Sequence, residues 1–221
     1  MRLPILAALA ALALPAPAAA QGCIGAPLAE RGRAVQLQAA STSYDQAAGS
    51  EGGLSLGASF RHNPRGFLAY SAEYHLGSVG DGGADLHSGG VVVAARAPLS
   101  VRGVSLCARA GALASRLDQG PSATRLDNVT FPVGVVLEAP LGGGAVVPYV
   151  APQYLFSRTR GAVLGLDYDA SGDGAGVEAG AGIRAGRAAV TLGGTYSALP
   201  EALITPAAST RSFFVRLGLV F

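Results

Sequence analysis

Alternation of apolar with small or polar residues is the feature that most constrains the fold of this chain. It is clearest in the last eleven residues, RSFFVRLGLVF, where Phe213, Val215, Leu217, Leu219 and Phe221 share one parity. Side chains two residues apart point to the same face of a β-strand, whereas a helical stripe recurs every three or four residues. The chain end is therefore predicted to be a strand with one continuous apolar face.

The same period of two recurs along the chain and predicts an all-β protein with about ten strands. The segments are 34–43, 52–61, 67–76, 89–97, 103–115, 129–139, 145–157, 174–184, 188–197 and 211–221. Segment 145–157 is the least regular because it contains Pro148 and Pro152, so eight strands is the alternative count. Strands of about 9–11 residues can cross a bilayer when they are tilted.

The connections between these segments indicate the topology. Turns of about five residues or fewer follow the second, fourth, sixth and eighth segments, and loops of roughly 8 to 16 residues follow the others. Short turns on one side and long loops on the other are typical of antiparallel up-and-down transmembrane barrels. An even number of strands also returns the C-terminus to the short-turn side.

The second parity of the segments carries the charged residues and predicts what lies inside such a barrel. It is otherwise rich in Gly, Ser and Ala, which fit a narrow interior. Arginine and glutamate could pair across a small lumen, because the guanidinium matches a carboxylate. A soluble barrel with this face in water is the alternative. The expected lumen polar network is Arg61, Glu73, Arg96, Arg109, Glu138, Glu178, Arg184 and Arg216.

The N-terminal residues indicate export. One basic residue, an apolar run and small residues before position 20 predict a cleaved signal peptide at 1–20, followed by a periplasmic arm at 21–33 and the barrel at 34–221. Cys23 and Cys107 are expected to form a disulfide. Cys23 lies just before the first strand, and Cys107 lies near the short-turn end of its own strand, so both are at the same end of the barrel. Lipid modification of Cys23 is the alternative for that residue.

The chain end resembles the C-terminal signature of bacterial outer-membrane β-barrel proteins, with its final aromatic residue and alternating apolar positions. The resemblance rests on Phe213, Val215, Leu217, Leu219 and Phe221, and the strand rhythm extends it over roughly 34–221. It implies location in the outer membrane, contact with outer-membrane lipid, and recognition of the last strand by the barrel-assembly machinery. The sequence contains no cofactor motif, so no cofactor is expected.

Two groups of residues are weak candidates for chemistry. Asp167, Asp169 and Asp173 stand at calcium-loop positions of DYDASGDGAGVE, but no helix is expected on either side, so a flexible acidic loop is favoured. Some barrels are hydrolases at the outer rim, for which the candidates are His75, Asp81, Asp85, His87 and Ser88. No nucleophile motif surrounds these five residues, and we expect no catalytic residue.

The predicted function is a small outer-membrane barrel with a polar, largely filled lumen and acidic extracellular loops, in a structural or surface-interaction role. A narrow channel or ligand-admitting barrel, a rim hydrolase and a soluble ligand-binding barrel are the alternatives. The net charge of +2 gives no reason to expect a nucleic-acid partner. The extracellular acidic residues expected in loops are Asp45, Glu51, Asp81, Asp85, Asp118, Asp127, Asp167, Asp169, Asp173 and Glu201.

Overall fold

The computed structural model describes Cys23 and residues 32–46, 49–64, 68–80, 83–101, 104–118, 125–142, 145–163, 165–199 and 208–221. The expected signal peptide and most of the expected N-terminal arm lie outside these residues. Within them there is no helix long and apolar enough to cross a membrane.

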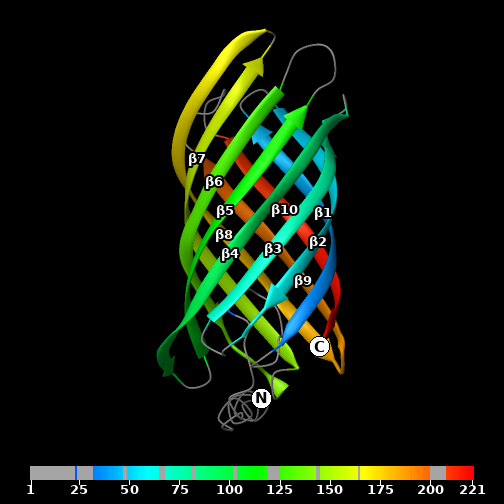
Figure 1. The fold of residues 1–221 in the computed structure, drawn as a ribbon, viewed down its shortest axis with the longest axis vertical. Helices are drawn as coiled ribbons and strands as arrows, with labels where there is room; N and C mark the ends of the chain where they lie inside the picture. The colour runs from blue at the N-terminus through cyan, green and yellow to red at the C-terminus, as the bar shows by residue number, and fades with distance from the viewer. Residues whose placement is uncertain are drawn as a thin grey trace, which may run out of the picture.

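Ten antiparallel strands close into one barrel, as the alternation predicts (Figure 1). Each strand pairs with its neighbours in the sequence, and β1 pairs with β10 to complete the ring. The predicted count of ten is confirmed, and the irregular segment with two prolines forms a full strand. The strands are β1 Arg33–Gln46, β2 Gly49–His62, β3 Leu68–Val79, β4 Ala84–Val101, β5 Val104–Asp118, β6 Arg125–Glu138, β7 Val146–Val163, β8 Leu166–Ala185, β9 Ala188–Leu199 and β10 Ala208–Val220.

The two faces of the barrel wall are inverted relative to a soluble protein. Large apolar side chains face outward, and Leu37, Leu56 and Leu217 expose 67, 69 and 56% of their surfaces. Arg61, Glu138 and Thr191 face inward and are 3, 0 and 0% exposed. An outward apolar belt around a polar interior is the arrangement of a transmembrane barrel. The soluble alternative, which requires the opposite orientation, is therefore wrong.

Glycines on the inward face make room for larger inward neighbours on the next strand. A Cβ on Gly218 would lie 2.5 Å from Cγ of Gln36, and one on Gly193 would lie 2.5 Å from Cζ of Phe214. Each of these larger side chains therefore lies across the backbone of a neighbouring strand. The small residues of the second parity thus allow a narrow interior to hold long side chains.

The prediction of long loops on one side of the barrel is wrong, because the strands continue through most of those residues. Only residues 164–165 separate β7 from β8, and only residues 47–48 separate β1 from β2. Gly-, Ser- and Asp-rich segments suggest turns, but a strand pair that extends beyond the belt keeps its hydrogen-bonded ladder. β7 and β8 remain paired up to Val163 and Leu166, and their hairpin reaches the top of Figure 1 in yellow.

The acidic residues that were expected in loops consequently lie in strands. Asp45, Glu51, Asp85, Asp118, Asp127, Asp167, Asp169 and Asp173 all fall within the bounds of β1, β2, β4, β5, β6 and β8. Asp81 and Glu201 lie outside the described residues.

Candidate functional site

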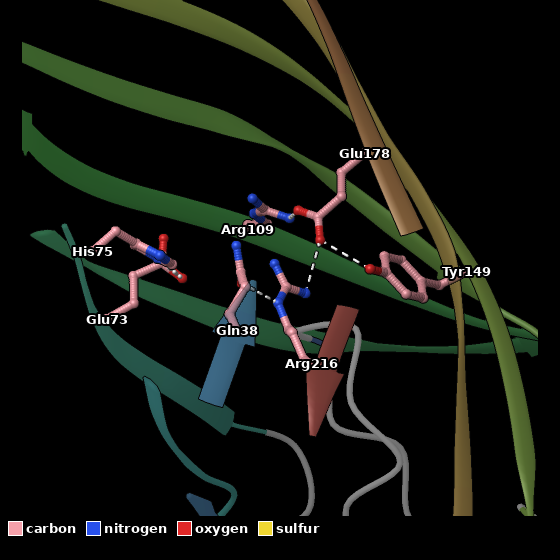
Figure 2. Close-up of polar contacts among 7 residues, drawn as sticks. All are labelled: Gln38, Glu73, His75, Arg109, Tyr149, Glu178 and Arg216. Carbon is pink, nitrogen blue, oxygen red and sulfur yellow. Dashed lines mark hydrogen bonds and ion pairs between the residues drawn. The ribbon is translucent and has the colours of Figure 1, made fainter. Parts of the chain in front are cut away.

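A buried carboxylate on β8 is the hub of the barrel interior (Figure 2). Oε2 of Glu178 accepts a hydrogen bond from Nη1 of Arg109 on β5 at 3.1 Å. Its Oε1 accepts from Nη1 of Arg216 on β10 at 3.2 Å and from the Tyr149 hydroxyl on β7 at 2.9 Å. The Arg109, Glu178 and Arg216 side chains are only 13, 9 and 8% exposed. Four strands are therefore joined across the lumen by one ion-paired cluster.

Arg216 is also held by two neighbours that are not charged. Its Nε donates to Oε1 of Gln38 on β1 at 2.6 Å. Its guanidinium carbon lies 3.9 Å from the centroid of the Phe214 ring, a distance typical of a cation–π contact. The planar guanidinium is thus fixed on one face and along two edges, which leaves it little freedom to swing away from Glu178.

Three other residues of the predicted lumen network have contacts of their own. Glu73 lies near His75 on β3, with Oε2 and Nε2 3.8 Å apart. Arg96 donates to the Ser105 hydroxyl at 2.9 Å, and Arg184 donates to the carbonyl of Gly186 at the β8–β9 turn. Arg61 and Glu138 are buried in the lower part of the lumen.

Four members of this interior were absent from the predicted network. Gln38 and Phe214 stand on the inward parity of their segments, so the alternation could have identified them. His75 also has inward parity, but it was considered only as a rim residue. Tyr149 lies between two prolines in the least regular segment, where no clear parity could be assigned.

The half of the barrel near Cys23 and Phe221 is filled with side chains. Its buried residues come from several strands and are 0 to 3% exposed; they include Gln36, Arg61, Val136, Glu138, Val147 and Thr191. The predicted disulfide is present between Cys23 and Cys107, with their Cα atoms 5.7 Å apart. Both cysteines are buried, and the bridge attaches Cys23 to the inner face of β5.

Loss of the disulfide is expected to lower the free energy of unfolding by about 2–4 kcal/mol, because it closes a long loop. The two cysteines are 84 residues apart in the sequence. Urea unfolding of the Cys23→Ser/Cys107→Ser variant, followed by circular dichroism, measures the effect. A reductant should shift the wild-type transition to that of the variant and leave the variant itself unchanged. A wild-type transition that already coincides with that of the variant without reductant would contradict the expected stabilisation.

Above the Glu178 cluster the lumen widens into a cavity of about 550 Å³. Arg109, Glu178 and Arg216 form its floor. Its walls combine leucines from β4, β5 and β7 with hydroxyl groups from β5, β6, β7 and β9. We call this space the vestibule. Its main lining residues are Leu86, Leu113, Leu117, Leu155, Ser115, Thr130, Ser157 and Thr195.

Ion pairs on the outward face mark the upper edge of the apolar belt. Arg116 pairs with Asp127 at 2.6 Å, and Asp169 pairs with Arg158 at 2.9 Å and with Arg160 at 3.2 Å. In the projecting β7–β8 hairpin, the hydrogen bond from Arg158 holds the pKa of Asp169 below its ordinary value. Such exposed charges belong in water, so they indicate where the hydrocarbon region ends.

The aspartates considered for calcium do not form a loop. They lie at alternate positions of β8, where Asp169 is engaged by two arginines and Asp173 accepts a hydrogen bond from the Tyr154 hydroxyl. Among the described residues, no group of three or more His, Cys, Asp or Glu side chains could hold a metal ion. The calcium-loop reading of Asp167, Asp169 and Asp173 therefore has no support from the fold.

The rim-hydrolase candidates are divided between the two faces of the wall. His75 and Ser88 are backbone partners on β3 and β4 and both line the vestibule. Asp85 and His87 have the opposite parity, and Nδ1 of His87 lies 3.1 Å from the Tyr74 hydroxyl. Asp81 lies outside the described residues. The described members of this group therefore do not converge on one catalytic site.

Comparison with known proteins identifies the family. The sequence model of the outer membrane protein beta-barrel domain matches residues 5–221. No curated protein sequence matches the chain. Among solved structures, the translocator domain of the autotransporter NalP from Neisseria meningitidis is 10% identical, with a TM-score of 0.50, over 86% of this chain and 88% of that chain.

Two further structures are similar at lower scores. Neisserial surface protein A (NspA) is 12% identical, with a TM-score of 0.48, over 85% of this chain and 96% of its own. The outer membrane protease OmpT from Escherichia coli is 10% identical, with a TM-score of 0.49, over 86% of this chain and 96% of that chain. At 10% identity, the NalP translocator domain indicates a shared fold alone. Since the family model spans nearly the whole sequence, the chain belongs to the outer membrane protein beta-barrel domain family and is an outer-membrane β-barrel.

Proposed function

We propose that this protein is a closed, non-conducting outer-membrane barrel that acts through its extracellular side. The observation that carries the proposal is the Glu178 cluster, which spans the lumen directly above an interior filled with buried side chains. Hydrated ions need a continuous polar path, whereas several residues in this half of the barrel are completely buried.

The energetics of the cluster favour a lumen that stays closed rather than one that opens and closes as a gate. Opening a path past Glu178 would separate it from Arg109, Arg216 and Tyr149 at once. Breaking a buried ion pair typically costs about 3–5 kcal/mol, because the remaining charges lose their partner in a region with little water. A barrier of this kind keeps the open population small in the absence of a ligand that stabilises it.

Single-channel recording in planar bilayers tests the closed lumen. The purified barrel is expected to give no steady openings, while an open porin added afterwards to the same bilayer shows that insertion and recording work. Heat-dependent gel mobility confirms that the added protein is folded. Reproducible openings of uniform size from the wild-type barrel would overturn the proposal and favour the narrow-channel alternative.

The vestibule favours a second candidate, a barrel that admits a small ligand from outside. Its volume of about 550 Å³ falls in the range of small-molecule sites, and it combines apolar walls with a charged floor. Filling it through Leu113→Trp should abolish any ligand-induced rise in melting temperature. Screening wild type and this variant against the same compounds separates vestibule binding from binding elsewhere.

A further inference from the structure

A groove on the lipid-facing side of the wall is a binding site that the closed lumen does not explain. We propose that it holds one acyl chain of a phosphate-bearing lipid, whose headgroup lies against Arg211. The groove has a volume of about 1190 Å³ and extends across the outward faces of β9, β10, β1, β2 and β3, with β1 as the middle strand. We call it the β1 groove.

Small residues on β1 create the groove. The outward residues Ala39 and Ser41 stand between much larger partners on both neighbouring strands. Ala39 pairs with Leu56 on β2 and Val215 on β10, and Ser41 pairs with Leu54 and Phe213. Leu54, Leu56 and Phe213 expose 69, 69 and 75% of their surfaces, so they project from the wall as ridges.

The central part of the β1 groove selects a thin occupant. There the ridges stand on the two strands that flank β1, so they are two strand spacings apart, or about 10 Å. A single hydrocarbon chain fits between ridges at this separation. The convex side of a second barrel would meet the exposed tips of Leu54 and Phe213 before it reached Ala39. A lipid chain is therefore a better match than a second copy of this protein.

A cation stands at the upper end of the β1 groove. Arg211 has the same outward parity on β10 as Phe213 and lies two residues closer to the extracellular end. Its side chain is 63% exposed, with Nε 3.5 Å from Oδ2 of Asp45, and its guanidinium carbon lies 6.0 Å from the Tyr196 ring centroid. This loose pairing leaves donors that can reach a phosphate at the interface, where arginine and tyrosine commonly lie.

The apolar groove and the cation at its upper end together indicate the occupant. An apolar groove embedded in the belt contacts hydrocarbon, and each methylene it buries contributes about 0.8 kcal/mol in lipid-anchor measurements from water. Within the bilayer that gain largely cancels, because other lipid tails are equally apolar. Selectivity must therefore come from the shape of the groove and from the Arg211 contact with the phosphate.

Photo-crosslinking in lipid nanodiscs tests the site. The probe is phosphatidylglycerol with a diazirine on one acyl chain, and crosslinked peptides are mapped by mass spectrometry. Crosslinks are expected to concentrate on the strand segments around Ala39–Ser41 and Phe213–Val215. The Ala39→Leu/Ser41→Leu variant, which fills the groove, should lose most of them. The control Ala108→Leu/Ala110→Leu adds the same bulk to the outward face of β5 and should lose none.

The headgroup contact has its own readout. Wild type should prefer the phosphatidylglycerol probe over a diacylglycerol probe with the same chains, and Arg211→Gln should reduce that preference about 5-fold, or about 1 kcal/mol. Uniform crosslinking around the barrel, or unchanged crosslinking in the filled variant, would overturn the proposal. A dimer in the nanodiscs that is lost in the filled variant would replace lipid by a second barrel as the occupant. Conductance is independent of these outcomes, so the closed-lumen proposal stands or fails separately.

Discussion

Glu178→Ala is expected to lower the free energy of unfolding by about 3–5 kcal/mol, the largest effect that we predict for a single lumen residue. The substitution leaves Arg109 and Arg216 facing each other inside the barrel without the carboxylate that both contact. It also leaves the Tyr149 hydroxyl without its acceptor. Because the chain contains no tryptophan, urea unfolding in phosphocholine vesicles is followed by circular dichroism and by gel mobility.

Two comparisons separate the loss of the ion pair from a general effect of truncation. Asp169→Ala also removes a carboxylate that contacts two arginines, but its ion pairs are exposed, so the change should be much smaller. Replacing the whole triad, through Arg109→Met, Glu178→Leu and Arg216→Met, should restore most of the stability. A Glu178→Ala protein that unfolds at the wild-type urea concentration would show that the cluster is not stabilising.

The strands and their two faces could be predicted from the sequence because alternation is a local property. Whether Leu217 faces outward depends only on its parity relative to Phe213 and Phe221. The same reasoning placed Arg109, Glu178 and Arg216 inside before any contact was known. The fold then confirmed both the direction of these side chains and the ten strands.

Contacts across the lumen could not be predicted in this way. Glu178 is 69 residues from Arg109 and 38 from Arg216, and no two of the three strands that carry them are neighbours in the barrel. Which charges meet depends on strand tilt and on the accumulated register around the ring. Alternation gives the face on which a residue lies but not its height in the barrel.

The lengths of the loops were predicted wrongly for a different reason. Composition distinguishes residues that favour turns, but it does not show where two paired strands stop. The segment 167–173 contains three aspartates and a glycine, yet it continues β8 because β7 supplies hydrogen-bond partners along its whole length. Where a strand pair extends beyond the membrane, both of its faces are in water. Its residues then show no apolar alternation from which the pairing could be predicted.

Val133→Arg is expected to lower the free energy of unfolding by about 2–4 kcal/mol, the cost of placing arginine near the middle of the lipid-facing belt. Val133 is 49% exposed on β6, and its backbone partners are Ala110 on β5 and Tyr154 on β7. The arginine side chain would project into hydrocarbon, where it finds neither water nor a carboxylate. Unfolding by urea in vesicles measures the change.

Leu166→Arg is the matched control, because it makes the same kind of substitution at an even more exposed position. Leu166 is 74% exposed at the tip of the β7–β8 hairpin, beyond the ion pairs that mark the edge of the belt. In water the arginine is well solvated, so stability should change little. Equal costs at the two positions would mean that Val133 does not face hydrocarbon, and the inverted orientation of the wall would then be wrong. A large cost at Val133 alone requires a low-dielectric surround on the outside of the barrel, which a soluble barrel does not have.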